Sequence, residues 1–394
     1  MSSARIIRWG ILGTSKISET MAAAIQKSST GRLAAIGSRA NAEKFVASIS
    51  KDDPDLASIK QFNDFQQLID DRDIDAVYIG LPHHLHYEWT LKAVKAGKHV
   101  LCEKPFLISP SNDPHSEAER MDEIIWEVTK LDVVCMEALM YRYHPFIKQL
   151  ENLIKDGFVG DVKLYRAIYT YDIVNLINPA ESGAMRSLGC YPISLVRLLA
   201  GAEPTEIRAN GRTNSNGMDL QANIVLNFAD ESVALISTAI DMNTHAQFEI
   251  HGTKGILKVT SNPFLPDENN NKMMFSAHDG ETFELDVTAA TKPLYSYQID
   301  AVGDAIVKGN FIHNKGAETL LDIKGNAKVV ETCLREVKAA NYVGKFERAA
   351  TVGISIPSSV TLNQMIHWGS EATEKVLKRD HDISQEYRYE AARL

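Results

Sequence analysis

The first hundred residues alternate short apolar runs with segments of helical periodicity, and this alternation constrains the fold more than any other feature. Apolar runs of strand length lie at residues 6–12, 33–37, 59–62, 75–80 and 99–102. Between them, apolar side chains recur every three or four residues, as in the helix predicted through Ile17, Met21 and Ile25. Parallel strands need a crossover connection, which a helix normally provides. The sequence therefore predicts an α/β fold with a doubly wound parallel sheet.

A second pattern begins at about residue 136. After a helical segment at 146–155, six segments of strand character follow with short turns among their connections, at 162–171, 205–213, 222–228, 233–240, 247–252 and 255–260. Strands joined by short turns usually pair antiparallel. We therefore expect a second, α+β part of the chain with a large, mostly antiparallel sheet, whose apolar outer face is covered by helices or by a partner subunit.

The turn after the first strand is a candidate for binding a dinucleotide. Such turns usually carry the pattern Gly-x-Gly-x-x-Gly, because glycine permits the tight bend and lets pyrophosphate approach the backbone N–H groups at a helix N-terminus. Gly13 occupies the first place, whereas Ser15 and Ser18 occupy the second and third. Gly13 alone is also compatible with a simple turn. Its place between a strand and a helix favours the dinucleotide.

The end of the second predicted strand bears on which dinucleotide binds. An NAD site usually has a carboxylate there for the ribose 2′-OH, whereas an NADP site has a cation for the 2′-phosphate. Here the strand ends in Gly37-Ser38-Arg39, and the first acid is Glu43. A guanidinium pairs with phosphate through two hydrogen bonds and stacks on adenine. NADP(H) is therefore the expected cofactor and NAD(H) the alternative. The competing interpretation is that Arg39 is an exposed residue at a helix start.

The tripeptide Glu103-Lys104-Pro105 follows the fifth predicted strand. Proline has no N–H to donate and forces the residue before it into an extended conformation, so Lys104 is expected at the strand's carboxyl end. Ligands of open α/β sheets bind at that edge. A lysine is most often a solvated surface group, and the position of Lys104 is what makes it a candidate for chemistry.

Five segments, in this order, resemble the Gfo/Idh/MocA family of oxidoreductases, named after glucose–fructose oxidoreductase. They are Trp9-Gly10-Ile11-Leu12-Gly13, Asp75-Ala76-Val77-Tyr78-Ile79, Pro82 with His86, Glu103-Lys104-Pro105, and the stretch from Gly183 to Pro192. The resemblance runs in register from about Ile6 to about Val343, and is closest to the branch of dimeric dihydrodiol dehydrogenase and glucose–fructose oxidoreductase. It implies a dinucleotide-binding Rossmann domain at 1–135, an α+β domain at 136–345 that binds substrate and forms a homodimer or larger homo-oligomer, and an extension at 346–394 beyond the family pattern.

The resemblance also implies roles for particular residues. Lys104 matches the family lysine beside the nicotinamide and the reacting hydroxyl, and Tyr191 matches the His or Tyr that gives and takes the proton. Ser187 stands where the commoner pattern has Asp, and of three glycines that often precede it the chain keeps Gly183. The residues expected at the cofactor are Gly13, Thr14, Ser15, Ile17, Ser38, Arg39, Leu81, Pro82, His86, Glu103, Lys104 and Arg142, and those expected at the substrate are Lys104, Arg186, Ser187 and Tyr191.

Hydride transfer to a carbonyl carbon leaves charge on the oxygen, so a proton must be supplied, and in the reverse direction removed. Tyrosine has an ordinary pKa of about 10, and a nearby lysine cation favours the phenolate. We therefore expect Lys104 to lower the pKa of Tyr191 and to help hold the oxygen. The alternative is that Tyr191 is a core tyrosine with a satisfied hydroxyl, the usual fate of this residue type inside a helix.

Two other groups of polar residues require interpretation. His83, His84 and His86 follow the fourth strand, but no cysteine or acid stands at ligand spacing, so no metal is expected and His86 matches the family histidine beside the cofactor. Arg142 and Arg186 are candidates for holding a cofactor phosphate or a substrate oxygen, with surface charges as the alternative.

Composition agrees with a two-domain cytoplasmic enzyme. The 394 residues exceed one ordinary core, and a net charge of -9 with scattered cations argues against nucleic acid or an anionic membrane as a partner. The four cysteines lack C-x-x-C spacing and are expected to be reduced, and no run has the length of a membrane span. The favoured function is an NADP(H)-dependent oxidoreductase of a sugar, polyol or dihydrodiol. The alternative is a nucleotide-binding regulator or sensor that has lost catalysis, for which the missing glycines and Ser187 leave room.

Overall fold

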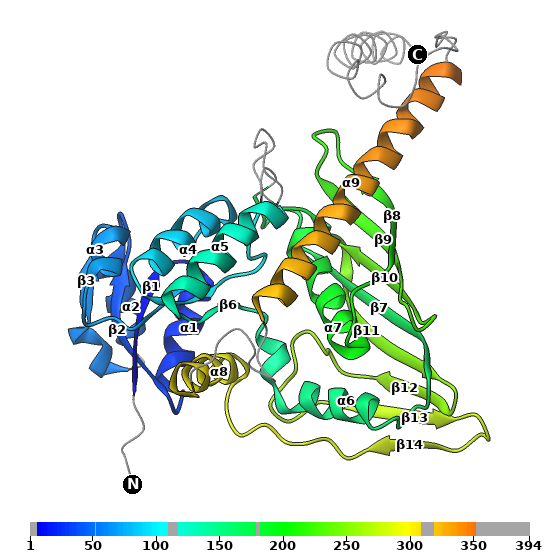
Figure 1. Ribbon diagram of the computed structural model, residues 1–394, viewed down its shortest axis with the longest axis horizontal. Coiled ribbons are helices and arrows are strands. Elements are labelled where there is room, and N and C mark those ends of the chain that lie inside the picture. Colours follow the sequence, from blue (N-terminus) through cyan, green and yellow to red (C-terminus); the bar gives the residue numbers. More distant parts are fainter. Residues whose placement is uncertain (1–5, 52, 109–116, 179–181, 309–318, 352–394) are drawn as a thin grey trace, which may run out of the picture. The chain divides into compact units, whose positions relative to one another are not determined.

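The computed structural model describes residues 6–51, 53–108, 117–178, 182–308 and 319–351 (Figure 1). The chain divides into two compact units at 1–341 and 342–394, and the description below concerns the first. The expected extension at 346–394 lies outside the described residues, apart from the last turns of helix α9 (Leu320–Thr351).

The first sheet has six strands in the order β3-β2-β1-β4-β5-β6, and every neighbouring pair is parallel. This order confirms the predicted doubly wound sheet. The strands are β1 (Ile7–Leu12), β2 (Gly31–Gly37), β3 (Lys60–Phe62), β4 (Ala76–Ile79), β5 (His99–Cys102) and β6 (Cys135–Glu137). Both faces of β1 are buried, with Trp9 and Leu12 wholly inaccessible to solvent, which explains why its sequence is a nearly continuous apolar run.

Helices cover both faces of this sheet. One face packs against α1 (Lys16–Gln26), α2 (Ala42–Ile49) and α8 (Leu294–Lys308). The other packs against α3 (Phe65–Asp70), α4 (His86–Lys95) and α5 (Glu117–Leu131). Two short 3-10 turns, η1 (Pro54–Ser58) and η2 (His83–Leu85), complete the connections.

Helix α8 packs on the first sheet, although the expected domain boundaries place its sequence in the second domain. By sequence it falls in the part at 136–345, but Ile299 and Val302 belong to the apolar core of the first sheet. Asp300 fixes this packing because its carboxylate accepts hydrogen bonds from the Ser28 hydroxyl at 2.6 Å and the Ser29 N–H at 2.8 Å. The chain thus returns to the first sheet after it has built the second.

The second sheet has eight strands in the order β14-β13-β12-β11-β7-β10-β9-β8. All neighbouring pairs are antiparallel except β7 with β10, so the prediction of a mostly antiparallel sheet is confirmed. The strands are β7 (Val162–Asp172), β8 (Glu206–Thr213), β9 (Asp219–Asn227), β10 (Val233–Ala239), β11 (Asp241–Gly252), β12 (Gly255–Val259), β13 (Met273–Ala277) and β14 (Thr282–Leu285). The last two were not predicted.

One face of this sheet is buried and the other is mixed. Helices α6 (Pro145–Lys155), α7 (Cys190–Ala200) and α9 share a core with the inner side chains of the sheet. The opposite face carries exposed Leu235 and Met274. It also carries Glu249, which pairs with Arg166 at 3.2 Å and Lys258 at 3.3 Å. The face is therefore mixed in polarity, whereas the sequence predicted an apolar one.

Candidate active site

The carboxyl ends of β1 and β4 approach each other closely at Gly13. Its φ of +102° is a conformation that side chains disfavour, and an added Cβ would lie 2.8 Å from the carbonyl oxygen of Gly80. The Gly13 N–H donates to the carbonyl oxygen of Gly37 at the end of β2. Glycine is required here by the backbone, whichever ligand binds.

Helix α1 begins directly after this turn and offers backbone donors to a ligand. Ser15 is the N-cap residue, but its side chain makes no capping hydrogen bond. Its hydroxyl instead lies 3.0 Å from that of Ser18 and 3.3 Å from the Gly80 carbonyl oxygen. Uncapped N–H groups and the positive end of the helix dipole suit an anion. Ile17, the second residue of α1, is half-buried and packs on the core of the first sheet.

The end of β2 places two polar side chains beside this turn. The Thr14 and Ser38 hydroxyls lie 3.3 Å apart, and Ser38 also accepts from the Asn41 N–H at 3.2 Å. Arg39 is exposed, with its guanidinium 5.3 Å from the centre of the Phe65 ring. The cation is therefore held near the turn while its hydrogen-bond donors face solvent.

A buried histidine joins the loops that follow β4 and β5. The ring nitrogens of His86 lie 2.9 Å from the Pro105 carbonyl oxygen and 2.8 Å from that of Leu81. Pro82 is exposed at the start of η2, and the His83 ring lies 5.5 Å from that of His86. No group of three or more metal-ligating side chains occurs in the described segments. His86 thus fixes the loop that carries Lys104.

Lys104 reaches from the first sheet to the helix that bears Tyr191. Its ammonium donates to the carbonyl oxygen of Ser187 at 2.8 Å and lies 5.1 Å from the centre of the Tyr191 ring. Glu103 supports the turn, because its carboxylate accepts from the Lys104 N–H at 3.1 Å and the Tyr78 hydroxyl at 2.8 Å. The structure thus brings together the two residues predicted to carry the chemistry.

The chain around Ser187 departs from a regular α-helix. Residues Met185–Gly189 form a π-helix, η4, that leads into α7. A π-helix pairs each carbonyl with the N–H five residues later. For Ser187 that residue is Pro192, which has no N–H. Local departures of this kind are frequent at functional sites.

Tyr191 is buried, with 7% of its surface exposed. Its backbone carbonyl accepts from the Tyr141 hydroxyl at 3.0 Å, and the Tyr169 ring lies 5.6 Å from its own. Burial raises the pKa of Tyr191 well above its usual range, and Tyr169 and Cys190 add to the effect. The pKa of Tyr191 is therefore raised, which is opposite to the direction expected from Lys104. Loss of hydration disfavours the phenolate and is the largest cause of this direction.

Of the other predicted polar residues, Arg186 and Arg142 are held by protein partners, whereas Ser187 is not. Arg186 pairs with Glu117 at 2.8 Å, and the buried Ser187 hydroxyl has no hydrogen-bond partner within the described residues. Arg142 donates to the Ser194 hydroxyl at 2.7 Å and pairs with Asp322. The Arg142 guanidinium is therefore not a surface charge, and its contact with a cofactor stays a prediction.

Sequence reasoning missed Glu137, the last residue of β6. Its side chain is 2% exposed, and its carboxylate accepts a hydrogen bond of 2.8 Å from the N–H of Phe106, two residues after Lys104. A signal was present, since Glu137 ends an apolar run as Glu103 does, and both lie at the carboxyl edge of the sheet.

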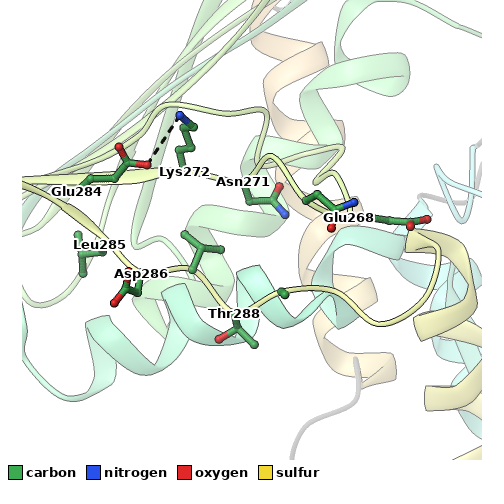
Figure 2. Close-up of a pocket in the computed structure, with 10 residues that line it drawn as sticks. Glu268, Asn271, Lys272, Glu284, Leu285, Asp286 and Thr288 are labelled. Carbon is green, nitrogen blue, oxygen red and sulfur yellow. Dashed lines mark ion pairs between the residues drawn. The ribbon is translucent and has the colours of Figure 1, made fainter.

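A separate hollow of ≈ 380 Å³ lies in the second half of the chain. Figure 2 shows the residues that line it, which come from 268–272 and 284–289, and a dashed line marks the ion pair between Lys272 and Glu284. The two charged atoms of this pair are 3.9 Å apart. None of the predicted cofactor or substrate residues lines it.

Comparison with known proteins agrees with this geometry. Residues 7–135 match the model of an oxidoreductase family with an NAD-binding Rossmann fold, and residues 147–258 match the Gfo/Idh/MocA C-terminal domain. The chain is 26% identical to a trans-1,2-dihydrobenzene-1,2-diol dehydrogenase of Xenopus laevis, over 84% of this chain and 98% of the relative. It is 28% identical to a D-xylose 1-dehydrogenase (NADP(+)) of Haloferax volcanii, over 76% of this chain and 89% of the relative.

Solved structures share the fold. A 3-ketoreductase from Actinomadura kijaniata superposes with a TM-score of 0.71 at 22% identity, over 84% of this chain and 98% of that one. An aldose-aldose oxidoreductase from Caulobacter crescentus gives 0.72 at 21% identity, over 85% and 98%. The two family models span the first sheet and much of the second, and the chain therefore belongs to the Gfo/Idh/MocA family of oxidoreductases.

Proposed function

We propose that the protein is an NADP(H)-dependent oxidoreductase that interconverts a hydroxyl and a carbonyl group on a sugar, polyol or dihydrodiol. The observation that carries this proposal is the convergence of Lys104, in the loop after β5, and Tyr191, on helix α7. The Lys104 ammonium also donates to the Ser187 carbonyl oxygen just before α7. The relatives are named as dehydrogenases of a dihydrodiol and of D-xylose, which supports this class of substrate.

The residues at the carboxyl edge of the first sheet fit a dinucleotide. The backbone N–H groups at the uncapped start of α1, at Ser15, would bind the pyrophosphate. Gly13 has no side chain, so the pyrophosphate can approach the backbone of the turn closely. Arg39 would meet the 2′-phosphate, and no carboxylate ends β2 to repel it. When bound, the nicotinamide supplies or accepts the hydride.

Tyr191 would move the proton. Because burial keeps its phenol protonated at neutral pH, it is suited to donate to the oxygen of a carbonyl as the bond is reduced. Lys104 would stabilise charge on that oxygen and, in the oxidative direction, favour the phenolate. The Ser187 hydroxyl and the buried Nε of Arg186 have no hydrogen-bond partner among the described residues, and we assign both groups to substrate hydroxyls.

We further infer a homodimer that uses the exposed face of the second sheet. Leu235 is 43% exposed near the middle of that face, and the Glu249 ion pairs lie beside it. An apolar patch rimmed by charges is typical of a protein interface. All four cysteines are buried and free, which supports a reducing compartment such as the cytoplasm. No helix in the described segments is long and apolar enough to span a membrane.

The test is a substrate screen read by absorbance of the reduced cofactor. Sugars, polyols and trans-dihydrodiols would be offered with NADP+, and the matching carbonyl compounds with NADPH. We expect turnover within one of these classes. Tight NADPH binding without turnover of any compound would favour a nucleotide-binding regulator instead.

A further inference from the structure

The turn that carries Lys104 is fixed by side chains from three directions. Glu103 accepts from the Lys104 N–H at 3.1 Å, and His86 contacts the Pro105 carbonyl oxygen at 2.9 Å. The third contact comes from the neighbouring strand, where the Glu137 carboxylate accepts from the Phe106 N–H at 2.8 Å. Each of these bonds holds a backbone group within two residues of Lys104.

Glu137 is well placed for this task. It pairs in register with Cys102, the last residue of β5, and the Ala138 N–H donates to the Cys102 carbonyl oxygen at 2.7 Å. Both Glu137 and the Phe106 side chain are almost fully buried, at 2% and 1% exposure. Glu137 therefore belongs to a strand of the sheet, whereas the turn that it holds at 103–106 lies outside the strands.

The second oxygen of Glu137 sets it apart from an ordinary structural acid. Oε2 is buried and has no hydrogen-bond partner within the part of the chain that the structure describes. A buried, unpaired carboxylate oxygen is costly when charged. The groups around Glu137 are mixed in charge, with Arg142 on η3 (Met140–Tyr143), Asp322 on α9, Glu103 after β5 and the Cys190 thiol on α7. Burial, as the main cause, raises the pKa of Glu137 to about 7, so it exchanges a proton near neutrality.

We propose that Glu137 is a positioning residue for the reaction, which holds the turn at 103–106 so that Lys104 meets Tyr191. The inference rests on the proposed function, because it assigns Glu137 to the same chemistry. It predicts that Glu137 acts through the Phe106 N–H and touches neither substrate nor cofactor.

Two variants distinguish the hydrogen bond that Glu137 accepts from the Phe106 N–H from the ability of Glu137 to take up and release a proton. Glu137→Gln keeps an oxygen for the Phe106 N–H but cannot titrate, whereas Glu137→Ala removes the acceptor. We expect Glu137→Ala to lower kcat by about 10- to 100-fold, the loss that a misplacement near 1 Å brings, with little change in NADPH affinity. Glu137→Gln should keep kcat within about threefold at pH 6, and any pH dependence of kcat centred near 7 should disappear.

Lys98→Met is the matched control. Lys98 precedes the same strand, β5, at the opposite edge of the sheet, and its buried ammonium donates to the carbonyl oxygens of Asp71 and Ile74, both at 2.7 Å. Its replacement should lower the melting temperature and leave kcat unchanged. Loss of kcat in Glu137→Ala no greater than in Lys98→Met would overturn the proposal.

Hydrogen exchange provides a measurement that needs no substrate. The amide signal of a peptide covering residues 103–108 should exchange faster in Glu137→Ala and as slowly as wild type in Glu137→Gln. Unchanged exchange in Glu137→Ala would remove Glu137 as the anchor of the turn. If the wild-type protein turned over no compound at all, the proposed function would fail, while exchange would still decide whether Glu137 holds the turn.

Discussion

The ammonium nitrogen of Lys104 lies 2.8 Å from the backbone carbonyl oxygen of Ser187. This bond links a loop of the first sheet to the π-helix before α7, where Pro192, five residues after Ser187, has no N–H to donate. The half-buried Lys104 cation is thus held beside the Tyr191 ring. A substrate oxygen that reaches Lys104 must share or replace this contact.

Removal of the Lys104 cation should affect catalysis together with Tyr191. Lys104→Ala should lower turnover and move the pH at which the remaining rate changes, because the phenolate would lose its nearby cation. In the double variant with Tyr191→Phe, the combined loss should be far smaller than the product of the two single losses, as for groups that act as a unit. Steady-state kinetics of the four proteins measures this. If the loss of turnover in the double variant equalled the product of the two single losses, Lys104 and Tyr191 would act independently and the proposed shared role would be wrong.

Cofactor preference should depend on Arg39. We expect the protein to bind NADPH more tightly than NADH, and Arg39→Asp to narrow or invert that preference, because a carboxylate repels the 2′-phosphate. Fluorescence titration of both reduced cofactors measures the ratio. Arg32→Asp is the control, since Arg32 is exposed on the same strand, β2, far from its carboxyl end. Equal affinities for the two cofactors in the native protein would refute the assignment.

Assembly should depend on the exposed face of the second sheet. Sedimentation at micromolar concentration should give at least twice the 43.7 kDa of one chain. Leu235→Glu on β10 should shift the protein toward monomer, because burying an unpaired charge in an interface is costly. Leu176→Glu, at a side chain 81% exposed and outside the sheet, should not. A monomer mass for the native protein would exclude this interface.

Acid stability should depend on His144, which is buried at the start of α6. Its Nδ1 accepts from the Phe146 N–H at 3.2 Å, and burial lowers the pKa of His144 to about 4. The unfolded chain has an ordinary histidine pKa near 6.5, so it takes up the proton first as pH falls. The contribution of His144 to stability is therefore complete above about pH 6.5 and is lost as pH falls toward about 4.

His144→Asn tests this directly, because asparagine also caps helices but does not titrate. The melting temperature of the variant should fall less than that of wild type between pH 7 and pH 5. His245→Asn, at an exposed histidine, should follow wild type. Parallel curves for wild type and His144→Asn would show that His144 is not the titrating group.

The elements predicted correctly from sequence are those whose signal is local. Buried parallel strands such as β1 and β4 are nearly continuous apolar runs. Gly13 follows β1, and Lys104 stands just after β5. Strand β14 was missed because its short, exposed sequence Thr-Phe-Glu-Leu lacks a buried face. The return of α8 to the first sheet was also missed, since its partners Ser28 and Ser29 are far away in sequence.

The sequence named the two residues of the candidate site, but it did not predict their electrostatics. The residues Lys104 and Tyr191 followed from motif position, and their convergence is observed. The direction of the Tyr191 pKa depends on how many neighbours exclude water from its ring, which no local pattern encodes. The same holds for Arg142, whose partners Ser194 and Asp322 come from separate helices.

Turnover by Tyr191→Phe, on a substrate identified in the screen, tests the central claim most directly. The variant loses only the hydroxyl, so the aromatic packing against Tyr169 and Tyr141 and the binding of NADPH should be preserved. We predict a fall in kcat of roughly two to four orders of magnitude, the usual contribution of a general acid–base group. Wild-type turnover in Tyr191→Phe would show that Tyr191 is a core tyrosine and that the proton comes from another group.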